Sequence, residues 1–98
     1  MNNDFIMYVS ADVNTVKFAT VISNKFKAEY DNVGLDALLE LRAIGAGAVN
    51  QAIKSIALAR GFVAKSDINL ICIPAFGEFE VKDGSIKSGM RLILRAGE

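Results

Sequence analysis

Apolar positions change their spacing several times along the chain, and each change marks a predicted element. Residues 5–9 form a short apolar run that predicts a strand. Within residues 15–30 apolar side chains recur every three or four positions, which predicts a helix. These positions are Val16, Ala19, Ile22, Phe26 and Tyr30. Asp12 or Asn14 can accept bonds from the free amides at the start of this helix, and Gly34 is a natural stop after it.

The middle of the chain repeats the same alternation of strand and helix. Residues 36–42 predict a second strand, and residues 46–62 predict a second helix that frays near Gly61. Residues 68–73 are rich in β-branched side chains and predict a third strand. Pro74 lacks an amide hydrogen, so we expect it to interrupt this strand, with pairing there at an edge or a bulge.

The end of the chain carries the strongest hairpin signal in the sequence. Asp83 and Gly84 separate two runs of alternating apolar and polar residues, which is typical of a tight turn between antiparallel strands. The apolar positions of the two runs are Phe79, Val81, Ile86, Met90, Leu92 and Leu94. The element order is therefore β-α-β-α-β-β. This order predicts an α/β two-layer sandwich, in which two helices cover one face of a small mixed sheet.

Composition favours one folded domain spanning residues 1–98. Hydrophobic residues make up 52% of the chain and charged residues 22%, which excludes a disordered protein. The longest apolar run, residues 70–76, is too short to span a bilayer. Residues 1–4 lack the basic start of a signal peptide. We therefore expect a cytoplasmic protein.

The reactive residue types needed for several classes of enzyme are missing from the sequence. The chain has one cysteine, Cys72, and no histidine, which excludes an intrachain disulfide, a structural zinc site and a His-dependent hydrolase. A buried thiol is the favoured interpretation of Cys72, with a reactive thiol as the alternative. The carboxylates are scattered, so acid–base catalysis is not indicated. We expect neither enzymatic activity nor a metal or other cofactor.

Charge is balanced over the whole chain but unevenly distributed. The formal net charge is zero, which does not suggest a strongly basic nucleic-acid binder. Residues 1–41 contain six acidic and three basic side chains, whereas residues 42–66 contain four basic and no acidic ones. The four are Arg42, Lys54, Arg60 and Lys65. An uneven field of this kind can still attract an anionic partner.

The junction between the second strand and the second helix is the main candidate site. Gly45 and Gly47 allow a sharp turn and the close approach of a ligand or another chain. The helix directs its free N–H groups and the positive end of its dipole toward this junction. Asn50, Gln51 and Lys54 follow in its first turns. The sequence therefore predicts a surface suited to a polar or anionic partner.

A helical projection at about 100° per residue separates two faces of the second helix. The predicted core face consists of Val49, Ala52, Ile53, Ile56, Ala59 and Val63. The other face carries Gly47, Asn50, Gln51, Lys54 and Leu58, and it is either a solvated face or a recognition surface. Leu58 interrupts its polar character and is a candidate contact for a protein partner. Arg60, on the apolar side, could meet either the last carbonyls of the helix or a phosphate.

Gly45 and Gly47 also match the first two glycines of a dinucleotide-binding fingerprint. The third glycine position is Asn50, and the chain is too short to hold a complete unit of that kind with a substrate domain. Dinucleotide binding is therefore a weak alternative.

The same segment resembles a known family. The runs IGAGAVNQAIK (residues 44–54), ALARGFVA (residues 57–64) and LICIPAF (residues 70–76) closely resemble the stage V sporulation protein S family of bacteria. The resemblance is dense over residues 41–76 and looser elsewhere. Residues 9–11 and 14–16 are similar to the first strand and helix start of that family. The family in turn resembles Alba, the small archaeal chromatin protein.

The resemblance implies a fold, a function and a site. Alba-like domains have the order β-α-β-α-β-β, generally act as dimers on DNA or RNA, and present the loop before their second helix to nucleic acid. Carried onto this chain, the implied nucleic-acid site is Arg42, Gly45, Gly47, Asn50, Gln51 and Lys54. This sequence departs from Alba at Ala46 and Ala48, where Alba carries more charge.

Two functions follow as hypotheses from these observations. The first is a non-enzymatic nucleic-acid-binding regulator, acting as a homodimer or larger homo-oligomer, whose glycine amides and helix dipole meet phosphates. The alternative is a protein-interaction or self-assembly module in a developmental or cell-division pathway, with Leu58 as its main contact. A sensor of a small anionic ligand is a third, weaker possibility. The sequence does not distinguish DNA from RNA.

Overall fold

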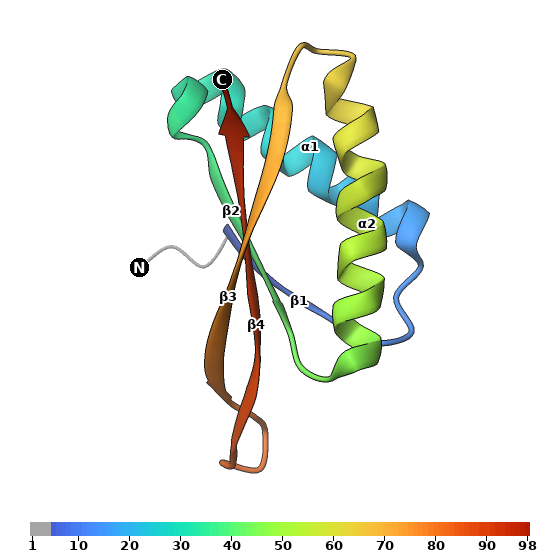
Figure 1. Ribbon diagram of the computed structural model, residues 1–98, viewed down its shortest axis with the longest axis vertical. Helices are drawn as coiled ribbons and strands as arrows, with labels where there is room; N and C mark the ends of the chain where they lie inside the picture. The colour runs from blue at the N-terminus through green and yellow to red at the C-terminus, as the bar shows by residue number, and fades with distance from the viewer. Residues whose placement is uncertain (1–4) are drawn as a thin grey trace.

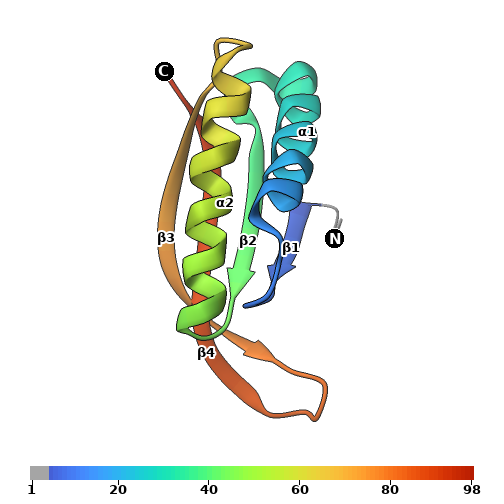
Figure 2. The same ribbon diagram turned by 90° about the vertical axis from the view of Figure 1, so that its right-hand side faces the viewer.

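The chain folds as the predicted two-layer α/β sandwich, with both helices on one face of a four-stranded mixed sheet (Figures 1 and 2). The computed structural model describes residues 5–98, and residues 1–4, whose lack of a basic start was noted above, lie outside it. The elements are β1 (Ile6–Val9), α1 (Thr15–Val33), a short 3-10 turn η2 (Gly34–Asp36), β2 (Leu38–Ala43), α2 (Ala46–Ala64), β3 (Asn69–Glu80) and β4 (Ile86–Gly97). None of the helices within residues 5–98 has the length and apolar content needed to cross a membrane.

The strand order across the sheet is β1-β2-β4-β3. β1 and β2 are parallel, and α1 provides the crossover that such a pair requires. β2 pairs with β4, and β4 with β3, in antiparallel orientation. β3 is therefore an edge strand that uses only one side of its backbone for pairing.

Capping residues set the ends of α1. The side chain of Asn14, rather than Asp12, accepts a bond from the Lys17 amide at 3.0 Å. The amide of Gly34 donates to the Tyr30 carbonyl, and Gly34 takes a positive φ of 63°. The helix ends at Val33, three residues later than the predicted end at Tyr30.

The core lies between the helices and the sheet, and it corrects the predicted faces of α2. Ile53, assigned to the core from its position on the helical projection, is 48% exposed, whereas Ser55 is fully buried. Ala48, Ala52, Ser55 and Ala59 form the buried stripe of α2 together with Ile56 and Val63. Short side chains let helices lie close together, so the buried face of α2 is centred on Ala48, Ala52 and Ala59; Ile56 and Val63 lie on it as predicted, and Ile53 lies outside it.

The predicted interruption of the third strand at Pro74 is wrong. β3 continues from Asn69 to Glu80, and Pro74 sits opposite Leu92 in the ladder with β4. The edge position of β3 explains this, because an edge strand has one neighbour and does not need an amide at every residue. The edge pairing predicted for Pro74 is therefore confirmed, and the two apolar runs around it belong to one strand.

The hairpin predicted at Asp83 and Gly84 is confirmed. Gly84 has a φ of 86°, and its amide donates to the Val81 carbonyl at 2.8 Å. The Ser85 hydroxyl and amide both donate to the Asp83 carboxylate, which lowers the pKa of Asp83. The tips of β3 and β4 project beyond the start of α2 as a two-stranded arm, residues 76–90 (Figures 1 and 2).

Candidate nucleic-acid interface

The start of α2 is exposed and has no side-chain cap. Gly45 occupies the N-cap position with φ 92° and ψ 155°, a conformation that favours glycine. Its carbonyl accepts the first helical bond, from the Val49 amide at 3.0 Å. The amides of the first turn have no carbonyl partner within the helix. Gly45 has no side chain that could accept a hydrogen bond from them. Among residues 5–98 the amides of Ala46 and Gly47 donate no hydrogen bond, and both residues are exposed, so these donors and the positive end of the dipole are available to an anion.

Gly47 serves a close approach within the chain itself. A Cβ atom added at Gly47 would lie 3.1 Å from the Cβ of Ala11, in the segment that connects β1 to α1. That spacing is tighter than ordinary van der Waals contact. The sequence predicted a close approach at Gly47 by a ligand or another chain, and the structure places the chain's own segment there. The glycine therefore joins the α2 start to the loop before α1.

Gln51 also contacts the segment that connects β1 to α1. Its side-chain Nε2 donates to the Val13 carbonyl at 3.0 Å, and its side chain is half-buried. Asn50 and Lys54 are exposed on successive turns of α2, within reach of a ligand in solvent. Of the three polar residues predicted in the first turns, two remain available, and Gln51 positions the helix.

Arg42 is separated from these residues by the sheet. Side chains alternate between the faces of β2, so Leu39 and Leu41 point into the core and Arg42 points to the face without helices. There Arg42 donates through Nε to the Glu40 carboxylate at 2.6 Å and through Nη1 to the Tyr8 hydroxyl at 3.2 Å. The expectation that Arg42 and Lys54 share one surface does not agree with this arrangement.

Arg42 belongs instead to a cluster of charged and aromatic side chains on the open face of the sheet. Its guanidinium carbon lies 5.8 Å from the Tyr8 ring centroid and 5.2 Å from that of Phe79. The two rings meet edge to face, 6.0 Å apart at 80°. Arg91 of β4 completes the cluster by donating to Glu40 through Nη2 at 2.7 Å. The cluster thus connects β1, β2, β4 and the arm.

The electrostatics of the cluster follow from its hydrogen bonds. The bond from Arg91 and then that from Arg42 hold the pKa of Glu40 below its usual value, against the opposing effect of burial. Glu40 in turn raises the pKa of both Arg42 and Arg91. The carboxylate of Glu40 therefore stays ionised at neutral pH. The spacing of Glu40 and Arg42 in the sequence could have indicated this contact, because residues two apart lie on one face of a strand.

Two glycines let the arm bend onto this cluster. Gly77 and Gly89 stand opposite each other in the β3–β4 ladder. A Cβ atom at Gly77 would lie 2.6 Å from the Phe79 ring, and one at Gly89 would lie 2.5 Å from the Ala43 carbonyl oxygen. Neither position has room for a side chain. The absence of side chains there allows Phe79 to lie buried over Arg42.

The remaining candidates on α2 have different roles. Leu58 is exposed, as predicted, and Ile53 and Phe62 on the same helix are also exposed. Arg60 donates to the Leu70 carbonyl at 3.1 Å and to Asn69 Oδ1 at 3.0 Å. It therefore contacts the beginning of the edge strand β3, rather than the last carbonyls of its own helix.

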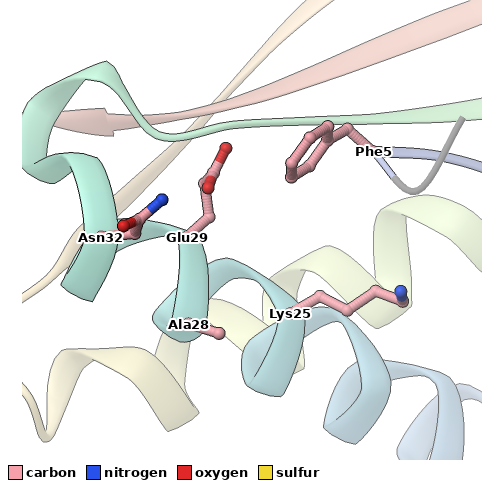
Figure 3. Close-up of a pocket in the computed structure, with 5 residues that line it drawn as sticks. All are labelled: Phe5, Lys25, Ala28, Glu29 and Asn32. Carbon is pink, nitrogen blue, oxygen red and sulfur yellow. The ribbon is translucent and has the colours of Figure 1, made fainter. Parts of the chain in front are cut away.

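No hollow among residues 5–98 gathers a set of catalytic or metal-binding groups. Figure 3 shows one beside α1, lined by Phe5, Lys25, Ala28, Glu29 and Asn32. The ammonium group of Lys25 extends away from Glu29 and Asn32 in this view, so the polar groups do not converge. Cys72 is half-buried, and burial raises the pKa of its thiol, which keeps it protonated.

Comparisons with known proteins agree with the architecture. A sequence model of the Stage V sporulation protein S (SpoVS) family matches residues 6–97. Among solved structures, Alba from Thermoplasma volcanium is similar, with a TM-score of 0.55 and 14% sequence identity. The similarity covers 92% of this chain and 98% of that chain. At this identity it shows a shared fold, and the Alba-like fold expected from the sequence is confirmed.

Proposed function

Because the chain belongs to the Stage V sporulation protein S (SpoVS) family and has the fold of Alba, we propose that it is a non-enzymatic, nucleic-acid-binding regulator in the cytoplasm. The observation that carries the proposal is the exposed start of α2, where Gly45 provides no side-chain cap. Phosphate groups bind such helix starts because free amides and the helix dipole both favour negative charge.

The proposed contacts differ from those expected from the sequence. The amides at Ala46 and Gly47 face the phosphate, Lys54 supplies charge, and Asn50 can donate to phosphate or sugar oxygens. Gln51 and Gly47 act as positioning residues through Val13 and Ala11. Arg42 makes no contribution, because the sheet separates it from α2 and Glu40 neutralises it. Contacts of this kind fix the position of a nucleic acid but carry little sequence information.

The charges around the α2 start predict moderate, salt-sensitive binding. Lys54 is the one basic side chain in the first three turns of α2, and Asp12 lies in the loop that packs against Gly47. The formal net charge of the chain is zero, so long-range attraction is weak. Binding therefore depends on the local geometry of the helix start and weakens as salt screens it.

The experiment that tests the proposal is a set of fluorescence anisotropy titrations with double-stranded DNA, single-stranded DNA and RNA. Each titration is run at low and at near-physiological salt, with light scattering to record the size of the free protein. We expect binding that weakens as salt rises, and the three probes identify the preferred nucleic acid. Absence of binding to all three at low salt would refute the proposal.

The alternative function is a protein-interaction or self-assembly module that does not bind nucleic acid. The observation that favours it is the exposed apolar pair Leu58 and Phe62, one turn apart on α2, with Ile53 also exposed elsewhere on that helix. Under this alternative, Leu58→Ser changes the oligomeric state or the affinity for a protein partner. Under the nucleic-acid proposal, the same variant keeps its affinity for the nucleic-acid probe.

A further inference from the structure

The face of the sheet opposite the helices carries an exposed aliphatic surface. The strand register places Ile73 beside Ile93, and Arg95 between Ile71 and Leu38. Leu38, Ile71 and Ile73 keep 43%, 38% and 45% of their surface exposed. We call the group Leu38, Ile71, Ile73, Ile93 and Arg95 the sheet patch. A contiguous exposed apolar surface on an ordered sheet is typical of an interaction site.

The surroundings of the sheet patch are basic. Arg91 lies on the same face, next to Ile93 along β4 and on the opposite side from Leu92, which points into the core. The carboxylate of Glu40 is shared by Arg42 and Arg91, while Arg95 has no carboxylate within salt-bridge distance among residues 5–98. Three guanidinium groups therefore face one carboxylate, and the sheet patch attracts an acidic partner.

The arm carries exposed apolar and acidic side chains on the side that faces away from the Arg42 cluster. Phe76, Glu78 and Glu80 alternate with the residues that face the cluster, and Ile86 stands opposite Glu80 in β4. Phe76 is 88% exposed, more than any other large hydrophobic side chain of residues 5–98, and Ile86 is 59% exposed. Neither glutamate forms an ion pair within the described part of the chain. We call Phe76, Glu78, Glu80 and Ile86 the arm face.

From this complementarity we propose that the arm face of one copy docks on the sheet patch of a second copy. Phe76 and Ile86 then cover the isoleucines of the sheet patch. Glu78 and Glu80 meet Arg95 and the unneutralised charge near Arg91. The partner is a second copy because each surface supplies what the other needs. The contact goes beyond nucleic-acid binding, and it lies beside the start of α2, because Phe76 and Gly45 line one hollow.

The two surfaces lie on alternate sides of the β3–β4 ribbon and toward its opposite ends, which decides how copies assemble. Because the arm face and the sheet patch are different surfaces, the contact does not use the same patch on both copies. A copy that docks through its arm face keeps its sheet patch free for another copy. The contact is therefore head to tail, and repetition builds chains of copies.

Two double variants test this contact. The arm variant carries Phe76→Ser and Glu78→Lys, and the sheet variant carries Ile73→Ser and Arg95→Glu, all at exposed positions. Circular dichroism and thermal melting confirm that each is folded. Each variant, and the wild type, is immobilised and exposed to each of the others in solution.

The expected pattern is specific to a head-to-tail contact. Arm variant on arm variant and sheet variant on sheet variant associate at least about tenfold more weakly than wild type on wild type. Arm variant on sheet variant associates nearly as well as wild type, because one intact arm face still meets one intact sheet patch. Equal association in all combinations, or no self-association of the wild type, would overturn the proposal.

A charge exchange provides an independent check. Glu78→Lys and Arg95→Glu each weaken self-association when made alone, and we expect the two together in one chain to restore much of it. Asp31→Lys, an exposed change of similar charge on α1, serves as the matched control and leaves self-association unchanged. Failure of the combined variant to recover would place the contact elsewhere and overturn the proposal.

Discussion

Arg42 and Glu40 lie two residues apart on the same face of β2, with Arg42 Nε 2.6 Å from Glu40 Oε2. Glu40 also receives Arg91 from β4, and Arg42 lies against Phe79 from the arm. The Glu40 carboxylate thus joins β2 to β4, and Arg42 extends the cluster to Tyr8 of β1 and to Phe79 of the arm. The cluster fixes the direction of the arm relative to the start of α2 and to the sheet patch.

Replacing Glu40 by Gln tests the contribution of this carboxylate to stability. The variant keeps the size of the side chain but loses its charge, leaving Arg42 and Arg91 without a counterion. We expect the free energy of unfolding to fall by about 1–3 kcal/mol, as for other hydrogen bonds to charged groups. Urea denaturation measures the change. Glu80→Gln, on the exposed arm face, is the control and changes stability little.

The same carboxylate gives stability a dependence on pH. The folded pKa of Glu40 is lowered from its ordinary value of 4.5, so its stabilising effect is complete above that value. The effect is lost as the pH falls through the folded pKa. The wild type should therefore lose more stability than Glu40→Gln when the pH is lowered from about 5 toward 3. Parallel losses in both proteins would contradict a role for Glu40.

Gly89→Ala tests whether the arm needs its glycine pair. The new methyl group would lie 2.5 Å from the Ala43 carbonyl oxygen, which belongs to the backbone and cannot move aside easily. We expect a loss of about 1–3 kcal/mol in the free energy of unfolding, typical of overpacking. Gly61→Ala is the matched control, because a Cβ there meets nothing within 4 Å. Since Gly61 lies within α2, that change should stabilise by up to about 1 kcal/mol.

Gly47→Ala and Ala11→Gly together test the contact between α2 and the segment before α1. We expect Gly47→Ala to lower the melting temperature, because its Cβ would lie 3.1 Å from that of Ala11. Ala11→Gly removes the opposing methyl group, so the double variant should be more stable than the sum of the single changes predicts. Strict additivity would show that the two positions do not press on each other.

The sequence predicted the order of elements because helical and alternating patterns dominate each segment separately. It placed Ile53 in the core because the projection weighs hydrophobicity, while packing of α2 depended on the short side chains of Ala48 and Ser55. It divided β3 at Pro74 because the edge position of that strand depends on pairing with β4, which comes later in the chain.

The sequence predicted the exposed start of α2 but not the contacts that Arg42 and Gln51 make. The exposed start of α2 depends on the local glycine pattern, and the structure retains it. The spacing of Glu40 and Arg42 places both on one face of β2, so their contact has a signal in the sequence, whereas the bond from Gln51 to the Val13 carbonyl depends on packing that no local pattern reveals. The partnership of Glu40 with Arg91 joins residues 51 positions apart, so spacing along the chain could not indicate it.

Asp12→Asn tests the electrostatics near the proposed phosphate site. Asp12 follows Ala11, the residue that packs against Gly47, so its negative charge opposes an anion at the α2 start. We expect the variant to bind the nucleic-acid probe roughly two- to fivefold more tightly at low salt, and the gain to shrink as salt screens it. Asp31→Asn, near the other end of α1, is the control and should leave the affinity unchanged.

The most direct test of the proposed function compares the salt dependence of wild type and Lys54→Ala. Lys54 is exposed, so the fold tolerates alanine, and Lys65→Ala at the other end of α2 is the matched control. If Lys54 contacts a phosphate, the slope of log affinity against log salt falls by about one unit in Lys54→Ala and stays at the wild-type value in Lys65→Ala. Identical slopes for wild type and Lys54→Ala would contradict phosphate binding at the start of α2.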